Sequence, residues 1–313
     1  MEATGRWEPA GRTGPSPAGA ATARVVVVTG GKGGVGKSNF SLNFSLALCE
    51  RGQRVLLVDG DSGLGSLDVL LGLCPERHLG HVLHGSCSAS DALVRAPLGL
   101  HLLAAASGLQ ALGDAAAEDV ARLGAALGSL SGAYDVCVLD AGAGLGPLVH
   151  ALLATAGERI VVTTPEPTAL ADAYATCKAI VAADPRGETW LLVNMAESAA
   201  EAEAAARGIV HVCRGYLAWS PRPLGWVPRD PRVCRSVREQ RPFLLATEQG
   251  PAARAMRGVA AAFCCESPAE RGPGLRDLLL SLVQRVGGAP SGRPESLVRG
   301  PWRTRAPRGG GRS

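Results

Sequence analysis

The stretch 29-TGGKGGVGKSNFSLNF-44 decides the fold. Residues 31–38 satisfy the pattern G-x-x-x-x-G-K-[ST], and they stand between the apolar run 24-RVVVVTG-30 and a segment of helical composition. Glycines let successive backbone N–H groups approach phosphate oxygens, and the N-terminus of the following helix adds positive field at the same point. In this context the pattern predicts a phosphate-binding loop that follows a strand.

The loop holds two lysines. Lys37 is placed to neutralise the β and γ phosphates of a nucleotide, and the Ser38 hydroxyl is placed to bind Mg²⁺. Lys32 is a second cation close to Lys37, which is costly unless phosphate charge offsets both, so the pair favours a triphosphate. The candidate nucleotide-binding residues of the loop are Gly31, Lys32, Gly33, Gly34, Val35, Gly36, Lys37, Ser38 and Asn39.

Apolar runs alternate with Ala- and Leu-rich segments along the chain. The runs cover 24–30, 54–61, 98–105, 134–142, 159–165, 188–194 and 223–228, and segments of helical length cover 38–51, 115–130, 168–182 and 199–217. Continuous apolar runs are typical of strands buried on both faces of a parallel sheet. Repeated strand-helix-strand units therefore predict a doubly wound α/β domain with a mainly parallel sheet flanked by helices.

Composition excludes several classes of protein. Of the 313 residues, 46% are hydrophobic and 19% charged, which is enough for one large core or two small ones. No apolar run reaches the length of about 18 residues needed to cross a bilayer, and no secretory signal is visible, so a cytoplasmic location is expected. The nine cysteines form no CxxC pair, which argues against a disulfide scaffold or a zinc site.

The ends of the chain differ from its middle. Residues 1–23 and 287–313 are rich in Gly and Pro and are expected to be disordered. The folded nucleotide-binding domain is expected to span 24–265, with an amphipathic helix at 272–286. The formal net charge is +4, and because arginines gather after residue 285 we interpret the charge as a basic tail rather than a basic domain.

Three aspartates follow apolar runs. Asp59 and Asp61 end the second run, and Asp140 ends 134-YDVCVLDAG-142. Ligands of α/β sheets bind at the carboxyl ends of strands, so Asp59 and Asp140 are candidates to hold Mg²⁺ through water. Asp61 is a candidate to orient or deprotonate the water that attacks the γ phosphate. A solvated acidic turn is the alternative for the pair of residues 59 and 61.

The string 32-KGGVGKS-38 resembles the deviant phosphate loop of the MinD/ParA group of ATPases. The resemblance implies a slow, Mg²⁺-dependent hydrolysis of ATP to ADP and phosphate, with Asp61, Lys32 and Lys37 as catalytic residues. It also implies an ATP-bound homodimer in which Lys32 reaches across the interface to the partner's nucleotide.

Three further strings resemble the FlhG (FleN) family of flagellar number regulators: 58-VDGDSGLGSLDVLLG-72, 139-LDAGAGLG-146 and 161-VVTTPEPTALADAYATCKAI-180. The likeness covers residues 24 to about 263. It implies control of flagellum number or placement, with the GTPase FlhF and flagellar switch (C-ring) proteins as partners. It also implies an adenine site at Asn194, Pro228 and Asp230, although an Asn at a strand end could equally cap the next helix.

The chain departs from this family in two places. Asp140-Ala141-Gly142 stands where the family commonly has Asp-Thr-Gly. Residues 1–23 contain nothing like the Asp-Gln-Ala motif with which some members stimulate FlhF. Stimulation of FlhF is therefore not supported by a motif in this chain.

The segment 274-GLRDLLLSLVQRV-286 carries one apolar stripe at helical spacing. A helix packed on the domain is one interpretation; a helix lying on the inner membrane, helped by the arginines behind it, is the favoured one. One such helix would bind the membrane weakly, and two copies in an ATP-bound dimer would bind more strongly through avidity. Membrane association would therefore be reversible, because it would depend on dimerisation. The stripe consists of Leu275, Leu278, Leu279, Leu282, Val283 and Val286.

Other functions remain open. A septum-site ATPase of MinD type, or a partition ATPase of ParA type with nonspecific DNA binding, would use the same loop; the latter should have basic patches on its folded domain. Because the arginines gather in a tail, no specific nucleic acid is expected. An iron–sulfur scaffold would need cysteines positioned to bridge the two subunits of a dimer. The adjacent Cys264 and Cys265 are the candidates for this role. A phosphotransferase acting on a small metabolite would need a substrate site that the sequence does not show.

Overall fold

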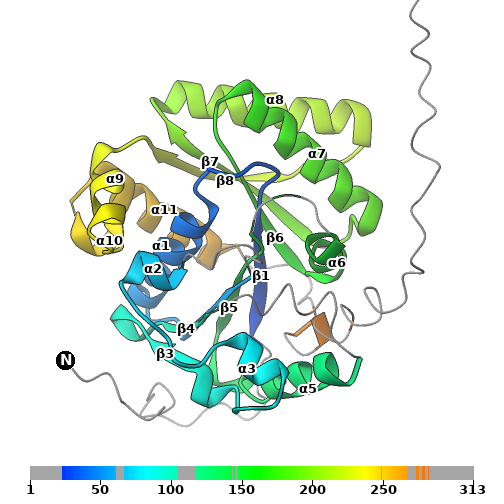
Figure 1. Ribbon diagram of the computed structural model, residues 1–313. Helices are drawn as coiled ribbons and strands as arrows, with labels where there is room; N and C mark the ends of the chain where they lie inside the picture. The colour runs from blue at the N-terminus through cyan, green and yellow to red at the C-terminus, as the bar shows by residue number, and fades with distance from the viewer. Residues whose placement is uncertain are drawn as a thin grey trace, which may run out of the picture.

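The fold is an eight-stranded sheet covered by helices on both faces (Figure 1). The computed structural model describes residues 23–60, 67–104, 117–142, 144, 147–247, 249–266, 273–274, 277–278 and 281. The strand order is β3-β4-β2-β5-β1-β6-β7-β8, and neighbouring strands are parallel except β3 and β4. The prediction of a doubly wound, mainly parallel α/β domain is confirmed.

The central strands are buried on both faces, which explains their continuous apolar sequence. All five residues of β2 and of β5 are buried. The strands are β1 Arg24–Thr29, β2 Val55–Asp59, β3 Leu93–Arg95, β4 His101–Leu103, β5 Val136–Asp140, β6 Glu158–Thr163, β7 Glu188–Ala196 and β8 Arg222–Pro228.

The expected run at 98–105 is shorter in the structure. Only 101–103 form β4, because residues 97–99 make a 3₁₀ turn, η2 (Pro97–Gly99), in which Leu98 has φ 59°. The antiparallel edge strand β3 before this turn has no counterpart among the apolar runs of the sequence. A three-residue strand paired on one side only is too short for a periodic signal.

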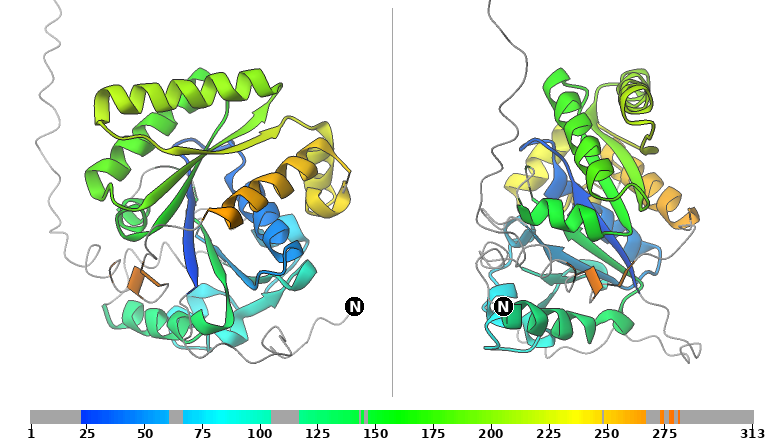
Figure 2. Two further views of the ribbon diagram at one scale, coloured as in Figure 1. Left: turned by 180° about the vertical axis from the view of Figure 1, so that it is seen from behind. Right: turned by 90° about the vertical axis from the view of Figure 1, so that its right-hand side faces the viewer.

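Helices form one layer on each side of the sheet (Figure 2). One layer contains α1 Lys37–Glu50, α2 Leu67–Leu71, α9 Pro231–Arg238, α10 Phe243–Ala246 and α11 Pro251–Cys265. The other contains α3 Leu79–Leu83, α5 Ala117–Gly128, α6 Pro147–Thr155, α7 Pro167–Ala183 and α8 Ala199–Leu217. Two more 3₁₀ turns follow helices along the chain: η1 Ser90–Ala92 precedes β3, and η3 Ser131–Ala133 precedes β5.

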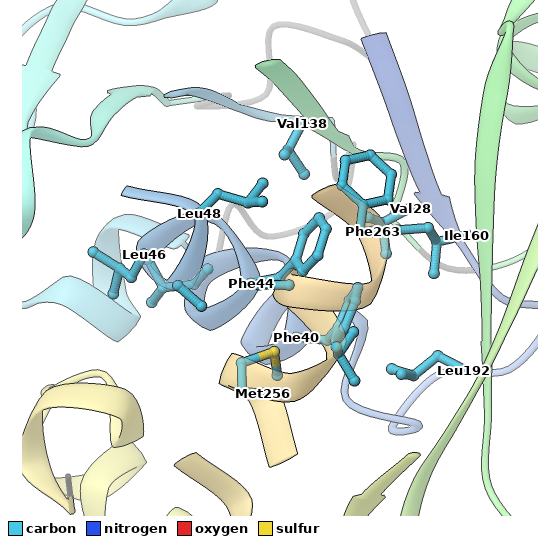
Figure 3. Close-up of a cluster of buried hydrophobic side chains, with 14 of the residues drawn as sticks. Val28, Phe40, Phe44, Leu46, Leu48, Val138, Ile160, Leu192, Met256 and Phe263 are labelled. Carbon is cyan, nitrogen blue, oxygen red and sulfur yellow. The ribbon is translucent and has the colours of Figure 1, made fainter. Parts of the chain in front are cut away.

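Aromatic side chains fasten α1 and α11 to each other and to the sheet (Figure 3). The rings of Phe40 and Phe44 stack at 5.1 Å between centroids, and Phe44 meets Phe263 of α11 edge-on at 5.2 Å. All three rings are almost completely buried. Close packing of this kind resists displacement, so the start of α1 and the loop before it have a fixed place.

Leu278 is the one residue of the predicted membrane stripe that the structure describes. Its side chain is fully buried in the core on the α3, α5 to α8 side, and its backbone N–H donates to the Gly274 carbonyl at 2.9 Å. At this position the packed-helix alternative is therefore the one seen. The other stripe residues Leu275, Leu279, Leu282, Val283 and Val286 lie outside the described residues, as do 1–22 and 287–313.

Over the described part of the chain, no helix combines the length and the apolar character that a bilayer crossing requires.

Replacement of Phe44 by alanine tests the packing of α1. Because the ring is fully buried between α1, α11 and the sheet, Phe44→Ala should lower the free energy of unfolding by about 3 to 5 kcal/mol in urea denaturation. Val69, which is 54% exposed on α2, provides the control: Val69→Ala should stay within about 0.5 kcal/mol of the parent. Equal losses in the two variants would contradict this description of the core.

Candidate nucleotide-binding site

The loop between β1 and α1 needs glycine for two different reasons. Gly34 and Gly36 have φ of 84° and 86°, a left-handed conformation that side chains disfavour. Gly31 has ordinary φ, but a Cβ atom there would lie 2.6 Å from the carbonyl oxygen of Asp172 on α7. The first glycine of the motif is thus required by the close approach of α7 to the loop, and the later ones by backbone conformation.

The two lysines of the loop point to different surroundings. Lys37 is 5% exposed, and its Nζ donates to the backbone carbonyl of Lys32 at 2.9 Å. Lys32 turns outward, and its Nζ donates to Glu166 Oε2 at 3.1 Å and to Thr168 Oγ1 at 3.0 Å. Both acceptors belong to the same subunit and lie at the start of α7. Lys37 therefore lies under the loop, while Lys32 lies over α7 at the surface.

Asp59 and Asp140 occupy matching places on neighbouring strands. They are register partners at the carboxyl ends of β2 and β5, and both are fully buried. The Asp59 carboxylate also accepts the Leu67 N–H at 3.3 Å, where α2 begins. Two buried carboxylates side by side are costly without a cation, and hard oxygen ligands suit Mg²⁺.

The residues present fit a magnesium site of the kind that relies on phosphate and water. Ser38 lies in the first turn of α1, directly after the loop. Among the described residues there is no group of three or more His, Cys, Asp or Glu side chains that could hold a metal alone. Mg²⁺ typically keeps several waters and takes one or two carboxylates together with substrate phosphate, so Ser38, Asp59 and Asp140 are sufficient protein ligands. Asp61 lies outside the described residues.

A pocket lies beside the loop and is lined by the predicted adenine-site residues Asn194, Pro228 and Asp230. Asn194, at the end of β7, donates its side-chain N–H to the Val35 carbonyl at 2.9 Å, which ties the sheet edge to the loop. The Asp230 carboxylate accepts the Arg232 N–H at 3.0 Å and the Ala252 N–H at 3.5 Å, so it caps α9 and holds the start of α11. Apolar side chains complete the walls; the lining includes Asn39, Phe40, Asn194, Pro228, Asp230 and Phe243.

The structure thus brings most of the predicted site residues together. The loop, Asp59, Asp140 and the pocket with Asn194, Pro228 and Asp230 share the carboxyl edge of the sheet. Sequence reasoning missed Glu166 and Thr168, which hold Lys32, and the backbone of Asp172, which presses on the loop. The string 161–180 contains all three, but no pattern in it indicates contact with a loop 134 residues away.

Known proteins share the sequence and the fold of this chain. The family model described as an AAA domain matches residues 23–184. The chain belongs to this family, as a MinD/ParA-like ATPase that uses Mg²⁺ and ATP.

Within the family the chain is similar to an antiactivator and to a flagellum site-determining protein. It is 38% identical to the antiactivator FleN of Pseudomonas aeruginosa over 237 residues, covering 76% of this chain and 85% of FleN. It is 32% identical to the flagellum site-determining protein YlxH of Helicobacter pylori over 223 residues, covering 70% and 74%. Among solved structures, the septum site-determining protein MinD of Pyrococcus horikoshii, complexed with Mg-ADP, has a TM-score of 0.63 at 25% identity, covering 76% of this chain and 94% of that one.

Substitution of Gly36 tests the loop geometry. In Gly36→Ala, the left-handed φ costs about 1 kcal/mol or more, and the new Cβ would lie 2.5 Å from the Asn194 side-chain nitrogen. Calorimetric titration should show binding of Mg-ADP weakened by about tenfold or more.

Gly52 is the matched control for this variant. It has φ 78° at the end of α1, and a Cβ atom at this residue would have no other atom within 4 Å. Gly52→Ala should lose about 1 kcal/mol of stability and keep its affinity for ADP. An unchanged ADP affinity in Gly36→Ala would show that this loop does not hold the phosphates.

Proposed function

We propose that this chain is an ATP-driven dimerisation switch that controls the number or the placement of flagella. The likeness to FleN and YlxH supports the flagellar role, and family membership supplies the ATPase activity. In this proposal the ATPase domain spans 24–265, and the segment 272–286 is a membrane-targeting helix between the domain and a basic tail.

The position of Lys32 is the observation that carries the proposal. Its ammonium group lies at the surface, with 39% of the side chain exposed, and its ionic partner Glu166 is 59% exposed. Ion pairs this exposed contribute about 0 to 1 kcal/mol, so a nearby polyphosphate can displace the carboxylate. We propose that Lys32 leaves Glu166 and Thr168 when a second subunit presents its bound ATP, and that this exchange couples dimerisation to ATP.

The remaining site residues are proposed to bind the phosphates, the metal ion and the base, and to orient the attacking water. Lys37, under the loop, neutralises the β and γ phosphates, and the loop residues 31–39 donate backbone N–H groups. Ser38, Asp59 and Asp140 hold Mg²⁺, and Asn194 with Pro228 and Asp230 surrounds adenine. Asp61, two residues beyond the end of β2, orients the attacking water.

Membrane and protein partners complete the proposed cycle. The buried position of Leu278 means that the C-terminal segment must leave the domain before its stripe can meet lipid. We propose that the ATP-bound dimer releases it, that two copies give reversible binding to the inner membrane, and that ADP returns the protein to the cytoplasm. The proposed protein partners are FlhF and flagellar C-ring proteins.

Substitutions of the two lysines should have different effects in an assay of ATP binding and ATP-dependent dimerisation. Lys32→Ala should bind ATP with little change but remain monomeric in sedimentation velocity, because only its reach to the partner is lost. Lys37→Ala should lose ATP binding itself, because its buried ammonium lies under the loop proposed to hold the phosphates. The proposal fails if Lys32→Ala dimerises with ATP as the parent does.

Loss of hydrolysis should trap the membrane-bound state. Asp61→Ala should accumulate as an ATP-bound dimer that sediments with anionic vesicles, whereas with ADP it should stay in the supernatant. The same variant truncated after residue 271 should still dimerise but no longer sediment with vesicles. A monomeric Asp61→Ala protein in ATP would refute the role of Asp61, and undiminished sedimentation of the truncated variant would refute the role of the helix.

A further inference from the structure

Met195 has a backbone conformation that side chains rarely adopt. Its φ is 58°, in the left-handed region, although it lies within β7 and is not one of the residues, such as glycine or asparagine, that tolerate this region best. On β8 the partner of Asn194 is Val227, and the next residue, Pro228, already pairs with Ala196. Met195 is therefore an extra residue on β7, and it forms a one-residue bulge in this parallel pair.

The bulge changes which side chains of β7 face the same way. In a regular strand successive side chains point to opposite faces of the sheet, so Asn194 and Met195 would point apart. Here Val193 and Ala196, three residues apart, both pack into one cluster with residues of α8. The two residues between them, Asn194 and Met195, both line the pocket beside the loop. The bulge thus turns the Met195 side chain toward the pocket.

Hydrogen bonds on both sides of the bulge hold it in place. The Asn194 side chain donates to the Val35 carbonyl of the loop at 2.9 Å, and the Arg229 N–H donates to the Ala196 carbonyl at 2.9 Å. Unfavourable backbone conformations persist where the surroundings impose them, and they gather at sites that bind ligands. The conformation of Met195 therefore favours a role in binding.

The Met195 side chain lies beside the loop and among apolar neighbours. Its terminal Cε would be 3.1 Å from a Cβ atom added to Gly36, the last glycine of the loop. The pocket that it lines has further apolar walls, among them Phe40, Val227 and Met256. A thioether donates no hydrogen bond and carries no charge, so it cannot hold a phosphate. The group that packs against Met195 should therefore be apolar or aromatic.

We propose that Met195 is a nucleoside-binding residue whose thioether packs against the face of the base. Methionine sulfur makes favourable contacts with aromatic rings, and the flexible, unbranched side chain adapts to the shape of its neighbour. This role rests on the proposed nucleotide site, in which Asn194, Pro228 and Asp230 surround adenine. Every base offers an aromatic face, so the contact strengthens nucleotide binding without selecting one base over another.

A purely structural bulge is the competing explanation. The bulge could serve only to bring the Asn194 amide to the Val35 carbonyl, and the side chain at position 195 would then be irrelevant. Glycine would be the least strained residue in that case, because it adopts a left-handed φ at no steric cost. A long apolar side chain at this position favours a role for the side chain itself.

The test uses full-length Met195→Gly and Met195→Leu proteins. The first removes the side chain together with the backbone strain, whereas the second keeps an apolar side chain of similar volume. Leu98→Gly is the matched control, because Leu98 has φ 59°, is 48% exposed and does not line the pocket. Calorimetric titration measures the affinity of each protein for Mg-ADP and for Mg-pyrophosphate, which has no nucleoside.

Met195→Gly should bind Mg-ADP about tenfold more weakly than the parent, the size of a strong sulfur–aromatic contact, and Mg-pyrophosphate within about twofold. Met195→Leu should bind Mg-ADP within about threefold of the parent, because most of the apolar contact remains. Leu98→Gly should match the parent for both ligands.

Three results would refute the role of Met195. Met195→Gly could keep the parental affinity for Mg-ADP, or Met195→Leu could bind Mg-ADP as weakly as Met195→Gly. Met195→Gly could also lose affinity for both ligands equally, which would mean that the side chain acts on the loop at Gly36 and not on the nucleoside. A parent protein that binds neither ligand would instead refute the nucleotide site of the proposed function, and this role with it.

Discussion

Two ammonium groups in one glycine loop must be kept apart, and the surroundings of the loop satisfy this requirement. Lys37 donates to the backbone carbonyl of Lys32, while the ammonium of Lys32 itself is drawn away to Glu166 and Thr168. Bringing both charges to one point is favourable only when several negative charges arrive there. The resting loop is thus arranged around the charge of a nucleotide, and its outward lysine is held only weakly.

The sheet supplies the rest of the site through its strand order. Because β1 lies between β5 and β6, and β2 pairs with β5, the loop after β1 opens next to the ends of both acidic strands. Asp59 and Asp140 meet there, and β7 brings Asn194 to the Val35 carbonyl on the other side. Aromatic packing of α1 against α11 fixes the helix that follows the loop, so the phosphate, metal and base regions keep their spacing.

Sequence alone was sufficient for the features that repeat or that follow a local pattern. Buried strands such as β2 and β5, the helices α1, α5, α7 and α8 and the phosphate loop were predicted close to their observed bounds, whereas the 15-residue helix α11 was not among the predicted helical segments. Contacts between distant segments were not predictable: Lys32 meets Glu166, and the Gly31 position meets the backbone of Asp172, because α7 packs beside the loop. The domain bounds and the roles of the individual site residues stay predictions.

The most direct test of the central claim is the position of Lys32 in a crystal structure with Mg²⁺ and a non-hydrolysable ATP analogue. The account predicts a dimer in which Lys32 Nζ has left Glu166 and lies within hydrogen-bonding distance of a phosphate bound by the opposite subunit. A monomer with a filled nucleotide site, in which Lys32 still contacts Glu166 and Thr168, would contradict it.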